Sequence, residues 1–205
     1  MVSEDMNKKL VQNFDVVEVR EASSFFFQFF WHIVGDDVVC AILLVLNFGH
    51  IQRKVNHSHI VLIPKEKNPQ RVVDYRPISL SNVIYKIISK VLANKLKMVL
   101  PNIISDLQIS FVPGRLITDN VNVAFELFNS LRERRNGKRM QMVVKLDMSK
   151  AYDRVEWAFL LRVMDKLGFD ARWSNLVMEG INIVSYSVLT PYFATINFTF
   201  LHFSK

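Results

Sequence analysis

The sequence predicts an α+β fold. Its composition and the order of its local patterns support this class, and its cysteine content limits the links that can stabilise it. Half of the 205 residues are hydrophobic and 16 are Phe, which is enough for a packed core and excludes global disorder. Helical and strand-like patterns are interleaved, but without the regular alternation of a doubly wound parallel sheet. Cys40 is the only cysteine, which excludes an intramolecular disulfide and a cysteine-rich zinc cluster.

The first part of the chain combines a charged segment with two apolar ones. Residues 1–24 are expected to be poorly ordered, and the charged N-terminus lacks the pattern of a secretory signal. Two apolar helices are predicted over residues 25–34 and 37–46, with Gly35 ending the first and Asp36 capping the second. Neither apolar run reaches the ~18 to 20 residues that a bilayer core requires, so buried or partner-facing helices are favoured over a membrane span.

A β-hairpin with a basic tip is predicted next. Residues 59–64 form a β-branched run with the length and boundaries of a strand. Residues 65–70 are predicted to turn, and residues 71–75 to return as the second strand.

Two amphipathic helices are predicted after the hairpin. Ser81 and Asn82 open the first, and Pro101 is expected to stop it. Its apolar positions recur at helical spacing, at Ile84, Ile87, Ile88, Val91, Leu92, Leu96, Val99 and Leu100. Asp119 or Asn120 is expected to cap the second helix. Its apolar stripe comprises Val121, Ala124, Phe125, Phe128 and Leu131.

The last third contains a predicted strand, two helices and an aromatic tail. The strand covers residues 141–146 and ends at Asp147, and the helix after it is closed by Gly168. The apolar residues of that helix are Trp157, Leu160, Leu161, Met164 and Leu167. Asp170 is expected to cap the next helix. Within the tail, residues 194–200 either add an edge strand or form an extension without an evolved role.

Charge and one carboxylate point to a function. The formal net charge of +7 and a pI near 9.6 fit a partner rich in phosphate, although many basic proteins bind no nucleic acid. Asp147, at the end of a buried strand, suits a divalent metal shared with a nucleoside triphosphate. The alternative is that Asp147 caps the following turn, and its position does not decide between the two.

Four motifs occur in a recognisable order. They are Pro64-Lys65, the Tyr-Arg-Pro-Ile-Ser-Leu run at 75–80, Gln108 with Phe111, and the Leu-Asp-Met-Ser-Lys-Ala-Tyr-Asp run at 146–153. This ordered set resembles the non-LTR (LINE-type) reverse transcriptases, particularly those of plant genomes, over about residues 25–189. The resemblance implies a partial right-hand polymerase fold, with fingers and part of the palm and with the thumb absent. Residues 190–205 would then be a divergent tail.

The resemblance also implies a reaction and its participants. An RNA-directed DNA polymerase adds deoxynucleotides from their triphosphates to a DNA primer on an RNA template. Asp147 resembles the first catalytic aspartate, which binds Mg²⁺, or possibly Mn²⁺, in a two-metal site. Tyr152 matches the aromatic gate that excludes a ribose 2′-hydroxyl, and its alternative role is ordinary packing. The family resemblance suggests the nucleus as the site of action, and no localisation signal supports a compartment.

The basic residues of the hairpin and of one loop are the candidate nucleotide-binding groups. Lys65, Arg71 and Arg76 are expected to grip triphosphate or template phosphates, with plain surface charge as the alternative for Arg76. By resemblance, Gln108 and Arg115 lie near the template and the incoming nucleotide. On the first amphipathic helix, Lys86 and Lys90 either follow a nucleic-acid backbone or serve solubility.

The departures from the family pattern set limits on the expected activity. The later Gly-Leu-Arg-Gln-Gly-Asp and paired-aspartate segments are not found after Leu189. Weak Mg²⁺ binding and little or no polymerase activity are therefore expected, as for a truncated product. The alternatives are a non-catalytic nucleic-acid-binding remnant, an unstable pseudogene product, or a membrane protein anchored by residues 25–48, although no membrane is expected. Gly35-Asp36-Asp37 spells an RNA polymerase signature, but it precedes Asp147 and is expected to be helical.

Overall fold

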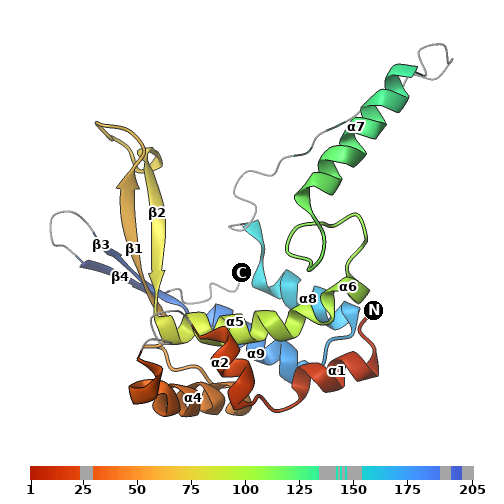
Figure 1. Cartoon of the computed structure of the whole chain (residues 1–205). Helices are drawn as coiled ribbons and strands as arrows, with labels where there is room; N and C mark the ends of the chain where they lie inside the picture. Colours follow the sequence, from red (N-terminus) through yellow and green to blue (C-terminus); the bar gives the residue numbers. More distant parts are fainter. Residues whose placement is uncertain are drawn as a thin grey trace.

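A computed structural model describes residues 1–23, 30–133, 142, 144, 146, 154–189 and 195–199. The fold is mixed α+β, as the sequence predicts. Its described helices are α1 (Glu4–Val11), α2 (Val16–Ala22), α4 (Trp31–Phe48), α5 (Val83–Lys97), α6 (Leu100–Ile103), α7 (Ile117–Glu133), α8 (Trp157–Leu167) and α9 (Ala171–Asn182). Its described strands are β1 (His57–Pro64), β2 (Tyr75–Ser81), β3 (Ser185–Leu189) and β4 (Thr195–Thr199). The β1–β2 hairpin and α7 rise from the same side of a layer of helices (Figure 1).

The sheet has the strand order β2-β1-β3-β4. β1 pairs antiparallel with β2, which confirms the hairpin, and parallel with β3. The two ring nitrogens of His57 lie 2.8 Å from the hydroxyls of Ser185 and Ser187, so side chains also join β1 to β3. β4 pairs antiparallel with β3, so residues 195–199 of the tail form an edge strand. β3 has no counterpart among the sequence predictions.

The second strand of the hairpin starts at Tyr75 rather than Arg71. Residues 72–74 form instead a short 3₁₀ turn, η1 (Val72–Asp74). The Asp74 carboxylate holds this turn by accepting hydrogen bonds from backbone amides, which removes those amides from a strand ladder. Pro77 lies inside β2, where its missing N–H is tolerated because β2 is an edge strand.

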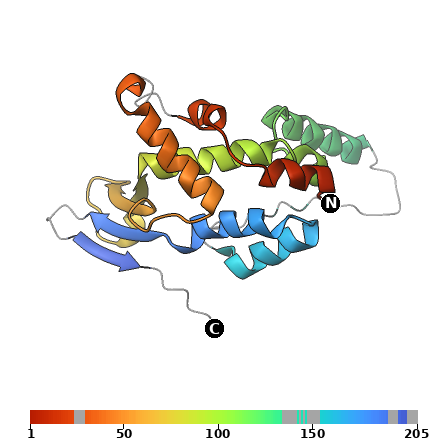
Figure 2. The same ribbon diagram turned by 90° about the horizontal axis from the view of Figure 1, so that it is seen from below.

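Helix α5 lies over the other helices of the layer. Asn82 caps it by accepting from the amide of Ile84, as expected. Ile87, Ile88 and Val91 are buried, and α5 packs against α2 and α4. Seen from below, α4 crosses in front of α5 (Figure 2). Pro101 does not end the helix but occupies the first turn of α6, where proline is tolerated.

The N-terminal segment is ordered, contrary to expectation. α1 and α2 place Leu10 and Val19 in the core, each with 0% of its surface exposed. Both helices begin with side-chain caps, at Ser3 and Asp15. Burial of the apolar residues on their inner side offsets the conformational entropy that the segment loses on ordering. The predicted start of the main domain at residue 25 and the predicted start of the tail at residue 190 stay predictions.

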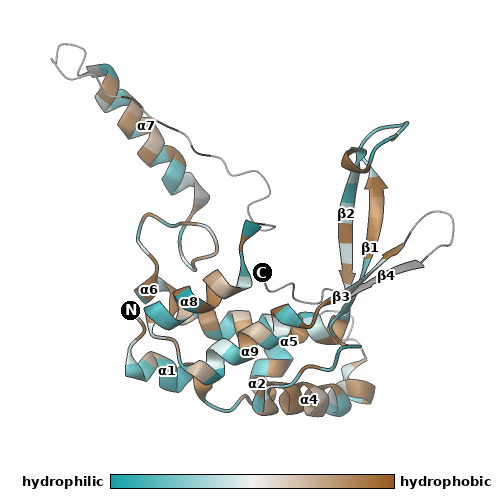
Figure 3. Cartoon of the chain, turned by 180° about the vertical axis from the view of Figure 1, so that it is seen from behind, coloured by the Kyte–Doolittle hydropathy of each residue, from teal (hydrophilic) through white to brown (hydrophobic). Residues whose placement is uncertain are grey.

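The apolar region 31–48 is one helix, α4, and not two. Gly35 lies inside it, against the Trp31 ring, where a Cβ would come within 2.7 Å of Trp31 Nε1. The helix ends instead at Gly49, whose φ of 76° is left-handed. By length and composition α4 could cross a membrane, and it is largely apolar (Figure 3). One face of α4, with Ile42 and Leu46, lies in the core, whereas Ile33, Leu44 and Phe48 are exposed.

The final helices follow the predictions closely. α8 ends at Gly168, with a φ of 86°, and Asp170 caps α9 by accepting from the amide of Arg172. Of the strand predicted over residues 141–146, the structure describes only Met142, Val144 and Leu146, and it assigns these three to no strand.

Candidate nucleic-acid interface

The predicted site residues that the structure describes fall into two groups. Lys65, Arg71 and Arg76 belong to the hairpin, whereas Gln108 and Arg115 belong to the loop between α6 and α7. The loop and α7 lie across from the hairpin, on the same side of the helical layer (Figures 1 and 3). The predicted catalytic and metal-binding residue Asp147 and the predicted gate residue Tyr152 lie outside the described residues.

The hairpin tip brings Lys65 and Arg71 together around Asp74. The Lys65 amide donates to the Asp74 carbonyl at 2.8 Å, and Lys65 Nζ donates to the Val73 carbonyl at 2.6 Å. Asp74 Oδ2 accepts from the amides of Gln70 at 3.1 Å and Arg71 at 2.8 Å. The Arg71 side chain is 78% exposed, and its Nη2 lies 3.6 Å from Asp74 Oδ1. The tip is therefore an ordered loop that presents its cations to solvent.

Arg76 lies on an apolar face of the hairpin. It pairs in register with Ile63 of β1, and alternation places Ile78 and Leu80 on the same face. Ile63 and Ile78 are each 43% exposed and Leu80 is 50% exposed. Arg76 is exposed as well, and within the described chain its guanidinium has no hydrogen bond or ion pair. Its guanidinium is thus free for an anionic ligand, beside exposed apolar side chains.

The loop between α6 and α7 is organised by Arg115. Its guanidinium donates to the Ser105 carbonyl at 2.6 Å and to the Gln108 carbonyl, and it pairs with Asp106 at 3.2 Å. The Arg115 side chain is only 18% exposed. The structure therefore joins Arg115 to Gln108, but through contacts inside the loop. A contact of either side chain with a nucleotide stays a prediction.

A row of lysines on α5 lies between the two groups. Lys86, Lys90 and Lys97 are exposed, and their spacing of four and seven residues places them along one face, over about 17 Å. This face is opposite to the buried Ile88, so it points away from the core. The sequence places Lys86, Lys90 and Lys97 off the apolar stripe of this helix, but only Lys86 and Lys90 were considered there for contact with a nucleic-acid backbone.

Lys95 differs from these lysines because it is buried, with 4% of its side chain exposed. Its Nζ donates to the Gln12 carbonyl at 2.7 Å, lies 3.5 Å from Glu18 Oε1 and sits 3.7 Å from the centre of the Phe14 ring. Burial lowers the pKa of Lys95, and the Glu18 carboxylate opposes that shift. Lys95 therefore fastens α2 to α5 and contributes no charge to the exposed surface.

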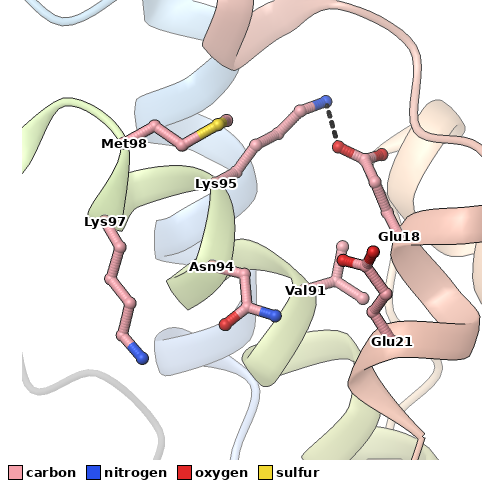
Figure 4. A pocket seen from close by; sticks show the side chains of 7 residues that line it. All are labelled: Glu18, Glu21, Val91, Asn94, Lys95, Lys97 and Met98. Atoms are coloured by element: carbon pink, nitrogen blue, oxygen red, sulfur yellow. Dashed lines mark ion pairs between the residues drawn. The ribbon is translucent and has the colours of Figure 1, made fainter. Parts of the chain in front are cut away.

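An open pocket of about 320 Å³ lies beside this ion pair (Figure 4). Its lining comes from α2 and α5, and comprises Glu18, Glu21, Val91, Asn94, Lys95, Lys97 and Met98. The Lys95–Glu18 pair closes one wall of it. Within the described residues, no group of three His, Cys, Asp or Glu side chains could hold a metal ion, and this pocket is no exception.

Comparison with known proteins identifies the family. The family model described as "Reverse transcriptase (RNA-dependent DNA polymerase)" matches residues 63–195. The chain is 33% identical over 144 residues to the transposon TX1 uncharacterized 149 kDa protein of Xenopus laevis, covering 70% of this chain and 11% of that protein. It is 24% identical over 134 residues to the Retrovirus-related Pol polyprotein from type-1 retrotransposable element R2 of Popillia japonica, covering 65% and 18%.

A third relative has the same character. The Retrovirus-related Pol polyprotein from type-1 retrotransposable element R2 of Nasonia vitripennis is 22% identical over 148 residues, covering 72% of this chain and 14% of that protein. The chain thus spans less than a fifth of the length of these relatives. They come from a frog and two insects, so the resemblance to plant elements stays a prediction. The chain belongs to the reverse transcriptase family, and its relatives make it a reverse transcriptase domain segment of the LINE type.

Proposed function

We propose that this chain is the part of a LINE-type reverse transcriptase that grips nucleic acid, corresponding to the fingers and part of the palm of a right-hand polymerase. Its ligands would be an RNA template, a DNA primer and deoxynucleoside triphosphates. The observation that carries the proposal is the row of exposed lysines on α5, set between the basic hairpin and the loop before α7.

The electrostatics of this arrangement favour a polyanion over a small ligand. Duplex nucleic acid carries one charge per about 1.7 Å of helix axis, so a row of cations about 17 Å long meets several phosphates at once. Each neutralised phosphate releases a condensed counterion, which makes binding strongly dependent on salt. On the hairpin, the free Arg76 guanidinium adds a planar donor that suits a phosphate.

The chemical step is a separate part of the proposal. Reverse transcriptases use divalent metals, and Asp147 is the residue proposed to bind Mg²⁺ or Mn²⁺ here, with Tyr152 as the gate against ribonucleotides. Primer extension on an RNA template, with an Asp147→Ala control, tests this part. Primer extension by the unchanged chain that disappears in Asp147→Ala would assign catalysis to the chain. Binding without extension would restrict its role to nucleic-acid binding.

Salt-dependent binding tests the gripping itself. The full chain is titrated against a fluorescein-labelled RNA–DNA hybrid at several salt concentrations. The K86A/K90A variant is expected to reduce the magnitude of the slope of log K against log salt by about 1.4 to 1.8, at about 0.7 to 0.9 per lost contact. K8A/K9A is the matched control, because it removes two exposed lysines from α1, away from the hairpin (Figure 1). Equal slopes for both variants would refute the proposed surface.

A further inference from the structure

We propose that Asp74 is a positioning residue, which sets the hairpin tip so that Arg71 and Lys65 are oriented to bind phosphate. Asp74 itself would not contact the nucleic acid. The inference rests on the proposed function of the hairpin and adds to it the device that orders the tip before a ligand arrives.

Asp74 is unusual among the residues around it. Its side chain is 11% exposed, whereas its neighbours Val72 and Val73 are 82% and 62% exposed. A carboxylate turned inward at an exposed tip needs partners, and it finds them in the backbone. Oδ2 accepts from the Gln70 and Arg71 amides, at 3.1 Å and 2.8 Å. Hydrogen bonds to an ionised acceptor are about twice as strong as neutral ones, so these two fix the turn.

The turn that Asp74 fixes orients both cations. Arg71, held through its own amide, adopts an extended backbone with φ −123° and ψ 157° and points its side chain into solvent. On the opposite strand, the Lys65 amide and Nζ donate to the carbonyls of Asp74 and Val73. The gap of 3.6 Å between Arg71 Nη2 and Asp74 Oδ1 exceeds a hydrogen bond, so the guanidinium keeps its donors for a phosphate.

Charge repulsion alone predicts the opposite effect of removing Asp74. A carboxylate beside a phosphate-binding site repels the ligand, so its removal would strengthen binding. If Asp74 instead positions Arg71 and Lys65, its removal weakens binding, because the two cations lose their shared orientation. Glu66 provides the matched control, since it is an exposed acid in the same tip with no hydrogen bond or ion pair in the described chain.

The experiment measures binding of the full chain to the same fluorescein-labelled RNA–DNA hybrid. D74A is expected to weaken binding about 10-fold, which corresponds to the loss of charge-assisted contacts by the two cations. D74N is expected to stay within about 2-fold of the unchanged chain, because the amide oxygen can accept from the same two backbone amides. E66A is expected to bind equally or slightly more tightly. In a K65A/R71A background, D74A is expected to add less than about 2-fold.

Amide hydrogen exchange gives a readout that does not depend on a ligand. D74A is expected to speed exchange at the Gln70 and Arg71 amides and to leave the rates in the β1–β2 ladder unchanged. In D74N, the Gln70 and Arg71 amides are expected to exchange at the same rates as in the unchanged chain. Tighter binding by D74A, or an equal loss in the K65A/R71A background, would overturn the inference and leave the proposed function intact. Failure of the unchanged chain to bind the hybrid would overturn both.

Discussion

Replacing Lys95 with methionine tests how the N-terminal helices are attached to the rest of the molecule. Methionine keeps most of the apolar stem and removes the charge. The hydrogen bond from Nζ to Gln12 contributes about 1.5 to 3 kcal/mol, and the contact with the Phe14 ring about 0.5 to 2 kcal/mol. Glu18 is 29% exposed, so its ion pair adds at most about 1 kcal/mol.

The replacement also removes the free-energy cost of burying the charged Lys95 amine, which offsets part of this loss. We therefore expect K95M to lower the free energy of unfolding by about 2 kcal/mol, below the about 3 to 5 kcal/mol for breaking one side of a fully buried pair, because Glu18 is partly exposed. Urea unfolding followed by circular dichroism at neutral pH measures it. K97M is the matched control, because Lys97 is exposed on the same helix and its replacement is expected to change stability by less than about 0.5 kcal/mol. Equal stability of K95M and K97M would refute the reasoning.

The same residue makes a prediction about pH. Burial lowers the folded-state pKa of Lys95 below its ordinary value of 10.5, with Glu18 opposing. Between the lowered pKa and 10.5, the unfolded chain binds more protons than the folded one. Stability that depends on Lys95 therefore rises with pH through that window. The difference in unfolding free energy between the unchanged chain and K95M is expected to grow there, and a difference that shrinks would contradict the direction of the shift.

Three further predictions concern the folded core. Gly35→Ala would place a Cβ 2.7 Å from Trp31 Nε1, and thermal unfolding is expected to show a loss of about 1 to 3 kcal/mol; an unchanged midpoint would contradict it. Burial raises the pKa of Tyr85, whose hydroxyl donates to the Gly180 carbonyl at 3.0 Å. Since the folded chain then holds the proton more tightly, stability is expected to fall as pH rises above 10, and less steeply in Tyr85→Phe. Asp170→Ala removes the cap of α9 and is expected to destabilise by about 1 kcal/mol in urea titrations, with no change excluding the cap.

Local signals predicted the hairpin and several helix ends correctly. Three of these helix ends depend only on a few neighbouring residues, so they can be predicted from the sequence. They are the cap at Asn82, the left-handed Gly168 and the cap at Asp170. Gly35 and Pro101 were predicted wrongly because the same residue types have two uses. A glycine can end a helix or admit a ring, and a proline can stop a helix or begin one.

For the candidate site, too, the sequence predicted the location of some residues correctly and missed the role of others. Motif order identified Lys65, Arg71 and Arg76 as hairpin cations, and the structure places all three there. It did not single out Asp74, although a carboxylate three residues after Arg71 is a recognisable turn-forming signal. Nor did it indicate that the Arg115 guanidinium folds back onto its own loop, since that depends on where the carbonyls of that loop lie.

The sequence by itself determined the family, the mixed fold class and the basic character of the surface, because these follow from residue types and short motifs. Only the tertiary structure decided which distant segments meet. β1 and β3 pair although His57 and Ser185 are 128 residues apart, and Lys95 is buried against Gln12 from 83 residues away. Such contacts depend on shared burial and on hydrogen-bonding groups that find partners only after the chain has closed, and no local pattern encodes that closure.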